Sequence, residues 1–400
     1  MSNPTPTDPR PEYGLFDCDH HYYETRDSFT RYMDPKFADQ AVRPVRQADG
    51  TEVVMVGDRP LTFLLGHDLY DTAGAPGSLK EKLIAMKKGG GDMEYGGIPM
   101  WPEWRDKDKR LASMDAQNVE GCLMFPNVAV TVEHFMATDD QLYANLRALN
   151  AWIDDDWGYA YQNRIFAPPM LSLRNLDMAV AELDRVIRDG ARCIAIKAGP
   201  AYGRNPADPY FDPFWSRANE AKVSVAFHLG ESGYNEMNSP QWGEDPNPPN
   251  FEMSAFQWAH NYCDRPMMET LTAFIYANFC KRFPHVQLIS VEHGCEWVPY
   301  LLKRMDKMRG MGRGGPWICG QLEERPSAIF KRQVKVTPFF EDDTPKVVDE
   351  IGSADCIVLG SDWPHPEGLK EPDHFFDSIE SLPASDQRNI MRDTGWSLVQ

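Results

Sequence analysis

The sequence predicts an α/β fold, a (β/α)8 TIM barrel with an insertion after the first strand. From about residue 115 onward, short apolar runs alternate with stretches whose apolar residues recur at helical spacing. The apolar runs are continuous, as expected for strands that are covered on both faces of a sheet. With one run near the N-terminus they number eight, and most are followed by a helix, which is the pattern of this barrel.

The expected strands and helices alternate within residues 14–400. The strand-like runs are 14–19, 119–127, 164–173, 191–199, 223–230, 286–294, 331–340 and 356–365. The helical patterns cover 140–160, 177–190, 212–222, 268–284, 297–308, 344–352 and 373–382. The sequence shows no repeat beyond this alternation.

Two parts of the chain interrupt the alternation. Residues 30–110 contain a pattern of small antiparallel strands around an Asp49-Gly50 turn, followed by a Gly-rich and aromatic stretch. We expect 30–110 to be an inserted subdomain that forms a lid or wall over the barrel mouth. The second irregular stretch, 230–260, follows the fifth strand. Long loops at this end of the strands form the substrate pockets of barrel enzymes.

Composition and charge exclude several classes of protein. The net charge of −19 disfavours binding to nucleic acid or to an anionic membrane surface, and no apolar run is long enough to span a bilayer. Residues 1–13 lack the parts of a secretory signal and are expected to form a flexible arm. The eight cysteines form no CxxC pair, which favours reduced thiols in a cytoplasmic protein. The expected partner is a small-molecule substrate, and exposed aromatic residues would allow a homodimer.

Polar side chains stand at the ends of most expected strands. Because the carboxyl ends of barrel strands meet at one rim, these side chains are expected to converge there. The adjacent His20 and His21 point to opposite faces of a strand, and the alternation with Asp17 and Asp19 selects His21 as the one that faces the rim. The full set is Asp19, His21, Asn127, Lys197, His228, His293 and Asp362.

Three histidines and two aspartates at such a rim form a set of nitrogen and oxygen donors. Such sets bind Zn²⁺, Mn²⁺ or Fe²⁺, because carboxylates neutralise the cation while imidazoles fix the geometry. Open positions in the coordination shell take water and substrate. A single histidine after a strand is more often an ordinary buried polar residue, so the prediction of a metal site depends on the whole set.

At these residues the sequence resembles the amidohydrolase superfamily, and within it the branch that includes aminocarboxymuconate semialdehyde decarboxylase. The resemblance covers residues 14–30 and 111–400. The first-strand motif of the family is D-x-H-x-H. Here the corresponding stretch is DCDHH, so Asp19 replaces the first histidine ligand. The stretches RLASMDAQNVEGCLMFPN and FDPFWSRANEAKVSVAFHLG are also similar to this branch in pattern.

The resemblance implies a ligand set for one divalent metal ion and a catalytic pair. His293 on the sixth strand would be a catalytic acid/base or a ligand of a second metal. In a hydrolase, Asp362 or His293 would take a proton from the attacking water, and His293 would protonate the leaving group. The implied ligands of the first metal are Asp19, His21, His228 and Asp362.

Two His/Glu pairs leave open whether the chain binds a second metal ion. His21 and Glu24 are three residues apart, as are His293 and Glu296, and di-iron carboxylate proteins use this spacing. Some non-haem di-iron oxygenases resemble this barrel, and here Glu24, His293 and Glu296 would then hold the second ion. Alternatively, both glutamates occupy first-turn positions that the helix dipole favours. Lys197 would be a carboxylated bridging ligand, an anchor for a substrate carboxylate, or a rim lysine paired with an acid.

The expected function is that of a metal-dependent enzyme that hydrolyses a C–N or C–O bond or decarboxylates a small aromatic or cyclic acid. Tryptophans in the irregular stretches favour a ring-bearing substrate, with Lys197, Asn127 and Trp258 as substrate-binding residues. The alternatives are a non-haem di-iron oxygenase on the same barrel and a non-catalytic metal-binding barrel. The residues do not decide among zinc, manganese and iron, or between one and two ions per chain.

Overall fold

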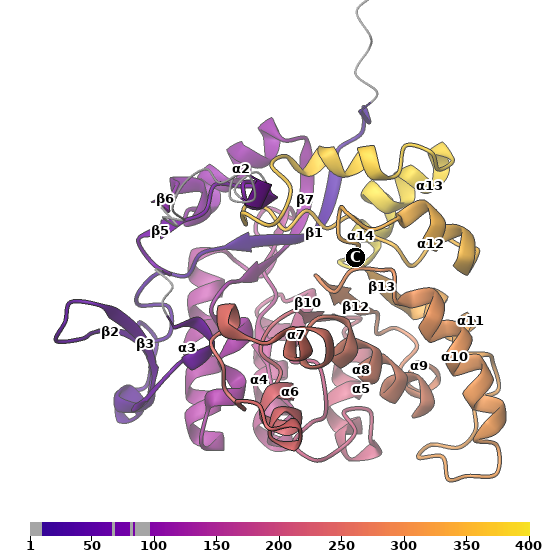
Figure 1. Ribbon diagram of the computed structural model, residues 1–400, viewed down its shortest axis with the longest axis horizontal. Helices are drawn as coiled ribbons and strands as arrows, with labels where there is room; N and C mark the ends of the chain where they lie inside the picture. Colours follow the sequence, from indigo (N-terminus) through magenta and orange to yellow (C-terminus); the bar gives the residue numbers. More distant parts are fainter. Residues whose placement is uncertain (1–9, 66–68, 81–82, 85–96) are drawn as a thin grey trace, which may run out of the picture.

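Two parallel β-sheets form the centre of the computed structural model, which describes residues 10–65, 69–80, 83–84 and 97–400 (Figure 1). The first sheet has the order β1 (Leu15–Tyr22), β7 (Val119–Pro126) and β8 (Ile165–Phe166). The second has the order β13 (Val334–Val336), β12 (Leu288–Val291), β11 (Ser224–His228), β10 (Cys193–Ile196) and β9 (Met170–Leu171). All neighbouring strands in these two sheets are parallel, which confirms the predicted α/β class.

The run 164–173, predicted as one strand, is divided between the two sheets. Its first part, β8, pairs with β7, and its second part, β9, pairs with β10. Pro168 and Pro169 stand between the two parts. A proline has no N–H to donate to a sheet ladder, so the strand is interrupted there and each sheet receives only a short strand.

The run 356–365, predicted as the eighth strand, is not a regular strand. Asp362 within it has a φ of +55°, which takes the backbone out of the extended conformation and prevents a continuous ladder. The run nevertheless lies between β13 and β1 and contacts both. The isolated parallel bridges that join it to them are Val336 to Ile357 and His20 to Trp363.

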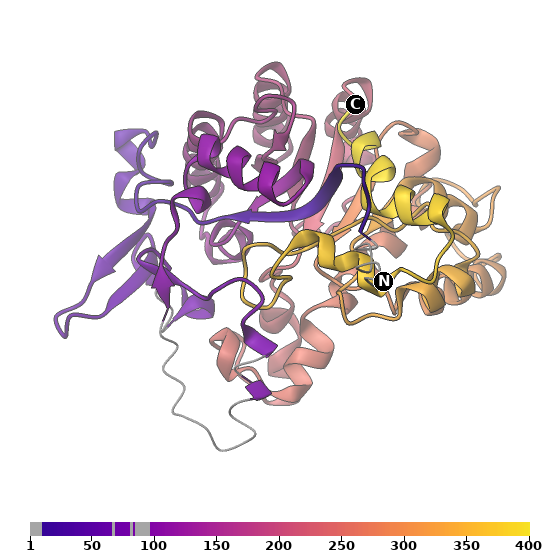
Figure 2. The ribbon, with the colours of Figure 1, turned by 90° about the horizontal axis from the view of Figure 1, so that it is seen from above.

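Helices surround the strands in both views of the molecule (Figures 1 and 2). Several begin at polar caps. The side chains of Asp106, Thr138 and Asn175 each accept a hydrogen bond from a backbone N–H of the first turn. The main helices are α2 (Lys107–Ala116), α3 (Asp139–Asp156), α4 (Leu176–Arg188), α5 (Asp212–Glu220), α8 (Asp264–Tyr276), α10 (Val298–Met311), α11 (Pro326–Gln333) and α12 (Thr344–Ile351), with the short α9 (Phe279–Arg282), α13 (Ala384–Arg388) and α14 (Thr394–Ser397).

Two predicted helices differ in the structure. The pattern over 268–284 breaks into α8 and α9 at Asn278, whose φ of +53° lies in the left-handed region and whose side chain donates to the carbonyl oxygens of Cys319 and Gly320. The pattern over 373–382 forms a 3-10 helix, Pro372–Ser378, instead of an α-helix.

The stretch after β1 contains the predicted antiparallel strands. β2 (Val42–Arg46), β3 (Glu52–Val56) and β4 (Arg59–Pro60) form an antiparallel sheet, and Gly50, with a φ of +89°, lies in the turn between the first two. This hairpin projects from the rest of the molecule in both views (Figures 1 and 2). β5 (Thr72–Ala73) pairs with β6 (Ile98–Pro99). Most of the predicted Gly-rich stretch lies outside the described residues, so the lid or wall stays a prediction.

The irregular stretch after β11 forms the short helices α6 (Tyr234–Asn238) and α7 (Ala255–Asn261). The predicted flexible arm lies largely outside the described residues, while Arg10 pairs with Asp373 at 3.0 Å.

All eight cysteines are free, and six of them are buried. No helix among the described residues is long and apolar enough to cross a membrane.

Candidate metal centre

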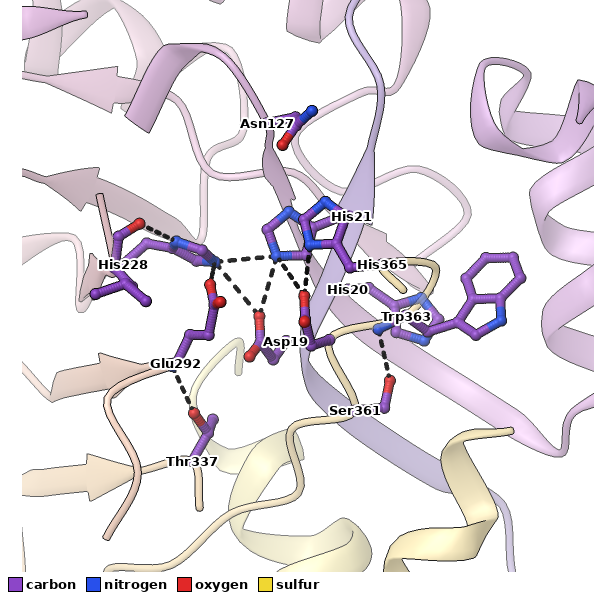
Figure 3. Close-up of polar contacts among 12 residues, drawn as sticks. Asp19, His20, His21, Asn127, His228, Glu292, Thr337, Ser361, Trp363 and His365 are labelled. Atoms are coloured by element: carbon purple, nitrogen blue, oxygen red, sulfur yellow. Dashed lines mark hydrogen bonds and ion pairs between the residues drawn. The ribbon is translucent and has the colours of Figure 1, made fainter. Parts of the chain in front are cut away.

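Three side chains that the sequence predicts as metal ligands, Asp19, His21 and His228, meet toward the carboxyl ends of β1 and β11 (Figure 3). His21 Nε2 lies 3.4 Å from Asp19 Oδ1 and 3.4 Å from Asp362 Oδ1. His228 Nε2 lies 3.1 Å from His21 Nε2 and 3.4 Å from Asp19 Oδ1. All four residues are more than nine-tenths buried. The structure therefore brings together two imidazoles and the Asp19 carboxylate in one buried group, with the Asp362 carboxylate against His21.

The spacing of the Asp19, His21 and His228 atoms fits one metal ion among them, while Asp362 forms a neighbouring donor group with His21 and His365. Nitrogen and oxygen ligands lie about 2.0–2.2 Å from an ion such as Zn²⁺, which places neighbouring ligand atoms about 3 Å apart. The Nδ1–H of His228 donates to the carbonyl oxygen of Leu229 at 2.8 Å, so its Nε2 presents a lone pair to the cluster. Asp19 Oδ1 is buried and has no hydrogen-bond partner in the part of the chain that the structure describes. A divalent cation would satisfy both atoms.

The charges at the cluster also favour a cation. Burial raises the pKa of Asp362 well above its usual range, and the carboxylates of Glu367 and Asp19 add to this effect. Burial lowers the pKa of His21 well below its usual value, and His365 and His228 add to it. The protein alone thus disfavours ionised carboxylates here and keeps His21 neutral. A divalent cation stabilises the carboxylates and binds the neutral imidazole.

His365 lies at the cluster although sequence reasoning missed it. Its Nδ1 is 2.6 Å from Asp362 Oδ1, and its ring lies against the ring of His21 with centroids 4.0 Å apart (Figure 3). Burial lowers the pKa of His365. The sequence signal that could have identified His365 is its position at the end of SDWPH, three residues after Asp362.

Glu292, also missed from the sequence, reaches the cluster from the end of β12. Its Oε2 lies 3.5 Å from His228 Nε2 (Figure 3). Its φ is +63°, and its N–H donates to Thr337 Oγ1 at 2.8 Å. A non-glycine residue held in this conformation at such a cluster suggests a functional constraint. Glu292 also groups with Asp362 and the exposed Glu367, with ligand atoms within 4.8 Å of one another.

His293 is buried beside the cluster. Its Nδ1 lies 3.3 Å from the hydroxyl of Ser290. Burial lowers the pKa of His293 to about 3, and the charge of His228 adds to this effect. Among the described residues, His293 belongs to none of the donor groups that could hold a metal ion. The catalytic role of His293 stays a prediction. Its predicted role as a ligand of a second metal finds no support in the donor groups of the described residues.

The structure corrects the expectation that Glu24 and Glu296 hold a second metal. The carboxylate of Glu24 is buried and accepts three backbone N–H bonds, from Asn127 at 3.0 Å, Val128 at 2.8 Å and Ala129 at 2.9 Å. Glu296 is exposed, and its Oε1 accepts a bond from the N–H of Asp343 at 3.4 Å. Both glutamates accept backbone N–H bonds from other parts of the chain, and neither occupies the first turn of a helix, which was the alternative expectation.

We expect Glu24→Gln to lower the free energy of unfolding by about 1–3 kcal/mol. The amide has one oxygen where the carboxylate has two, so at least one of the three N–H donors loses its acceptor. Metal content should stay at the wild-type value, since Glu24 does not reach the cluster. Urea denaturation and elemental analysis of the same preparation check both statements. A loss of metal with unchanged stability would restore Glu24 as a ligand.

The predicted substrate-binding residues lie at different places. Lys197 is half-buried, donates to the carbonyl oxygen of Ser232 at 3.1 Å and lines a small cavity together with His228. Asn127 stands near the imidazoles of the cluster with no polar side-chain contact drawn (Figure 3). Trp258 on α7 is 41% exposed, and its ring packs edge-on against Tyr262. Their contact with a substrate stays a prediction.

A buried set of imidazoles and carboxylates at the ends of parallel strands defines this protein as a candidate divalent-metal enzyme. Residues 16–394 match the family described as amidohydrolase. The chain therefore belongs to the amidohydrolase family and is an enzyme, which confirms the predicted resemblance. A crystal structure of an amidohydrolase from Mycobacterium avium subsp. paratuberculosis K-10 is 32% identical, with 98% of this chain and 100% of that chain covered and a TM-score of 0.85.

More distant solved structures share the fold. The 5-carboxyvanillate decarboxylase from Sphingomonas paucimobilis is 16% identical, with 82% of this chain and 98% of that chain covered and a TM-score of 0.58. A dihydroxybenzoic acid decarboxylase from Polaromonas sp. JS666, with bound manganese and the inhibitor 2-nitroresorcinol, is 18% identical, with 82% and 97% covered and a TM-score of 0.56. No curated protein matches the chain.

Proposed function

We propose that this chain is a metal-dependent carboxy-lyase that removes CO₂ from a small aromatic acid, with one divalent ion held by Asp19, His21, His228 and Asp362. The observation that carries the proposal is the convergence of His21 Nε2, His228 Nε2 and Asp19 Oδ1, with separations of 3.1–3.4 Å. The bound manganese of the dihydroxybenzoic acid decarboxylase, which shares the fold, supports a divalent ion.

Aromatic walls beside the cluster support a ring-bearing substrate. The ring of Phe125 lies 4.7 Å from that of His228, and Tyr262 packs between Phe63 and Trp258 at 5.8 and 5.1 Å. The named decarboxylases with this fold act on hydroxylated aromatic acids, and the same class of substrate would fill such a site.

When bound, the metal supplies Lewis acidity that holds the substrate carboxylate and a neighbouring oxygen. Glu292 is the residue placed to move the proton. Its Oε2 lies 3.5 Å from His228 Nε2 at the edge of the cluster, and burial raises the pKa of this carboxyl above its usual range. Glu292 then gives its proton to the ring carbon that bears the carboxylate. The C–C bond breaks, its electron pair returns to the ring, CO₂ leaves, and Glu292 regains a proton from water.

We expect chelation to abolish turnover and Mn²⁺ to restore it. Because the ion binds only the folded chain, saturation at 100 times its Kd should raise the free energy of unfolding by about 2.7 kcal/mol. Release of CO₂ from 2,6-dihydroxybenzoate, 5-carboxyvanillate and related acids is measured before and after chelation. Amide or ester hydrolysis without CO₂ release would show that the same metal centre catalyses hydrolysis instead of decarboxylation. Turnover that chelation leaves unchanged would contradict the proposal.

A second candidate function, a two-metal oxygenase, is favoured by one specific observation. Asp362 belongs to two further donor groups, one with His21 and His365 and one with Glu292 and Glu367. A second ion could share the Asp362 carboxylate there. Elemental analysis separates the candidates. One ion per chain supports the carboxy-lyase, while two irons with O₂ uptake support the oxygenase.

We also propose that the two parallel sheets belong to one eight-stranded barrel and that 30–110 forms a wall at its mouth. Support comes from residues 164–173, which join the sheets on one side, and from 356–365, which bridge β13 and β1 on the other. The backbone N–H of Cys18 donates to Leu359 O at 2.9 Å on this second side. A cytoplasmic location and a homodimer remain predictions.

A further inference from the structure

A buried network of three side chains lies behind the metal centre. Asp17, His20 and Arg110 are each fully buried. His20 Nε2 lies 3.1 Å from Asp17 Oδ2, an ion-pair contact without hydrogen-bond geometry, and His20 Nδ1 lies 3.5 Å from Arg110 Nη1. The imidazole of His20 is thus the group between a buried anion and a buried cation.

The guanidinium of Arg110 contacts mainly neutral groups. It donates to the carbonyl oxygens of Glu103 at 2.8 Å and His21 at 2.7 Å, and it lies over the ring of Trp363 with 4.7 Å to the centroid. Burial lowers the pKa of Arg110 to about 10. A charge in such surroundings is costly unless a counter-charge compensates it, and His20 is the side chain that connects Arg110 to the carboxylate of Asp17.

Both ends of this network hold the backbone of the metal-ligand residues. Asp17 Oδ1 accepts from the N–H of Asp19 at 3.1 Å and from the N–H of Ser361, the residue before Asp362, at 3.1 Å. Arg110 holds the carbonyl oxygen of His21. A register shift in β1 between Asp17 and His20 accompanies this arrangement. Three of the four ligand residues are therefore tied to the network through their own or adjacent peptide groups.

We propose that His20 is a positioning residue of the metal centre, which joins Arg110 to Asp17 so that the backbone carrying Asp19, His21 and Asp362 is fixed before the metal binds. The inference rests on the proposed function, because it needs a metal at the cluster. It explains why two histidines stand side by side on β1: His21 contributes to the donor cluster, and His20 orders the chain behind it. Groups behind a ligand shell typically change metal affinity 10- to 100-fold.

The test is a titration of metal-free protein with Mn²⁺ by calorimetry. His20→Phe keeps a ring beside Trp363, where the two rings are 5.5 Å apart, and removes both nitrogens. We expect its Mn²⁺ Kd to rise about 10- to 100-fold. The matched control is Trp215→Phe, which removes the buried bond from the indole N–H to Pro206 O elsewhere in the core. The control should lower the midpoint of urea unfolding and leave the Mn²⁺ Kd at the wild-type value.

A folded His20→Phe protein with wild-type Mn²⁺ Kd would overturn the inference, as would a control whose Kd weakens as much as that of His20→Phe. If His20→Phe does not fold, Asp17→Asn serves instead, because it keeps Oδ1 as an acceptor for the two N–H groups and replaces the charged Oδ2 that faces His20 with an NH₂ group. Its Kd should also rise at least about 10-fold, and a wild-type value would overturn the inference. Wild-type protein that binds no Mn²⁺ or Zn²⁺ would instead refute the proposed metal site itself.

Discussion

Asp362→Asn is expected to weaken Mn²⁺ binding by more than about 100-fold and to abolish turnover at ordinary metal concentrations. Loss of a group behind a ligand shell already costs up to about 100-fold in affinity, and Asp362 lies in the cluster itself, 3.4 Å from His21 Nε2. The amide can still accept the bond from His365 Nδ1, so the local geometry need not change. Mn²⁺ titration and CO₂ release at several Mn²⁺ concentrations measure the two losses.

The same substitution should not destabilise the metal-free protein. Burial and the neighbouring carboxylates of Glu367 and Asp19 disfavour the ionised form of Asp362, so a neutral amide relieves repulsion. Unfolding of metal-free Asp362→Asn is therefore expected at an equal or higher urea concentration than for metal-free wild type. Asp355→Asn is the matched control, because Asp355 is exposed at the start of the same chain segment. Asp362→Asn with wild-type affinity and activity would refute the ligand assignment.

The convergence of three predicted ligands could be expected from strand geometry. Parallel strands bring their carboxyl ends to one edge, so polar residues that directly follow apolar runs can be expected to meet, as Asp19, His21 and His228 do. The choice of His21 over His20 followed from the two-residue period of a strand. These rules need only local sequence, which is why they worked without knowledge of any contact.

The residues that sequence reasoning missed depend on backbone conformations that a strand pattern does not contain. Glu292 lies at the cluster with a φ of +63°, whereas the position at the strand end and the family resemblance favoured His293. His365 joins through a turn after Asp362. Glu24 has the spacing of a metal ligand but satisfies three backbone N–H groups from a distant part of the chain. Spacing alone does not show which partner a carboxylate finds.

Glu292→Gln is expected to lower kcat by about 10²- to 10⁴-fold, the contribution of a positioned acid or base. The amide has nearly the same shape but no proton to give to the ring carbon. The Mn²⁺ Kd should change far less than in Asp362→Asn, since Glu292 is not among the four residues proposed as ligands and its Oε2 lies 3.5 Å from His228 Nε2. Loss of kcat with retained metal is the pattern of a group that acts in the transition state.

Glu296→Gln is the control for this experiment, because Glu296 lies four residues further on and is exposed. It should keep wild-type kcat. Metal analysis of Glu292→Gln also separates the two candidate functions. A carboxy-lyase with one ion keeps that ion, whereas a two-metal enzyme loses one of its two ions together with the donor. Wild-type kcat in Glu292→Gln would remove Glu292 as the proton donor and turn attention to His293, the buried imidazole next to it.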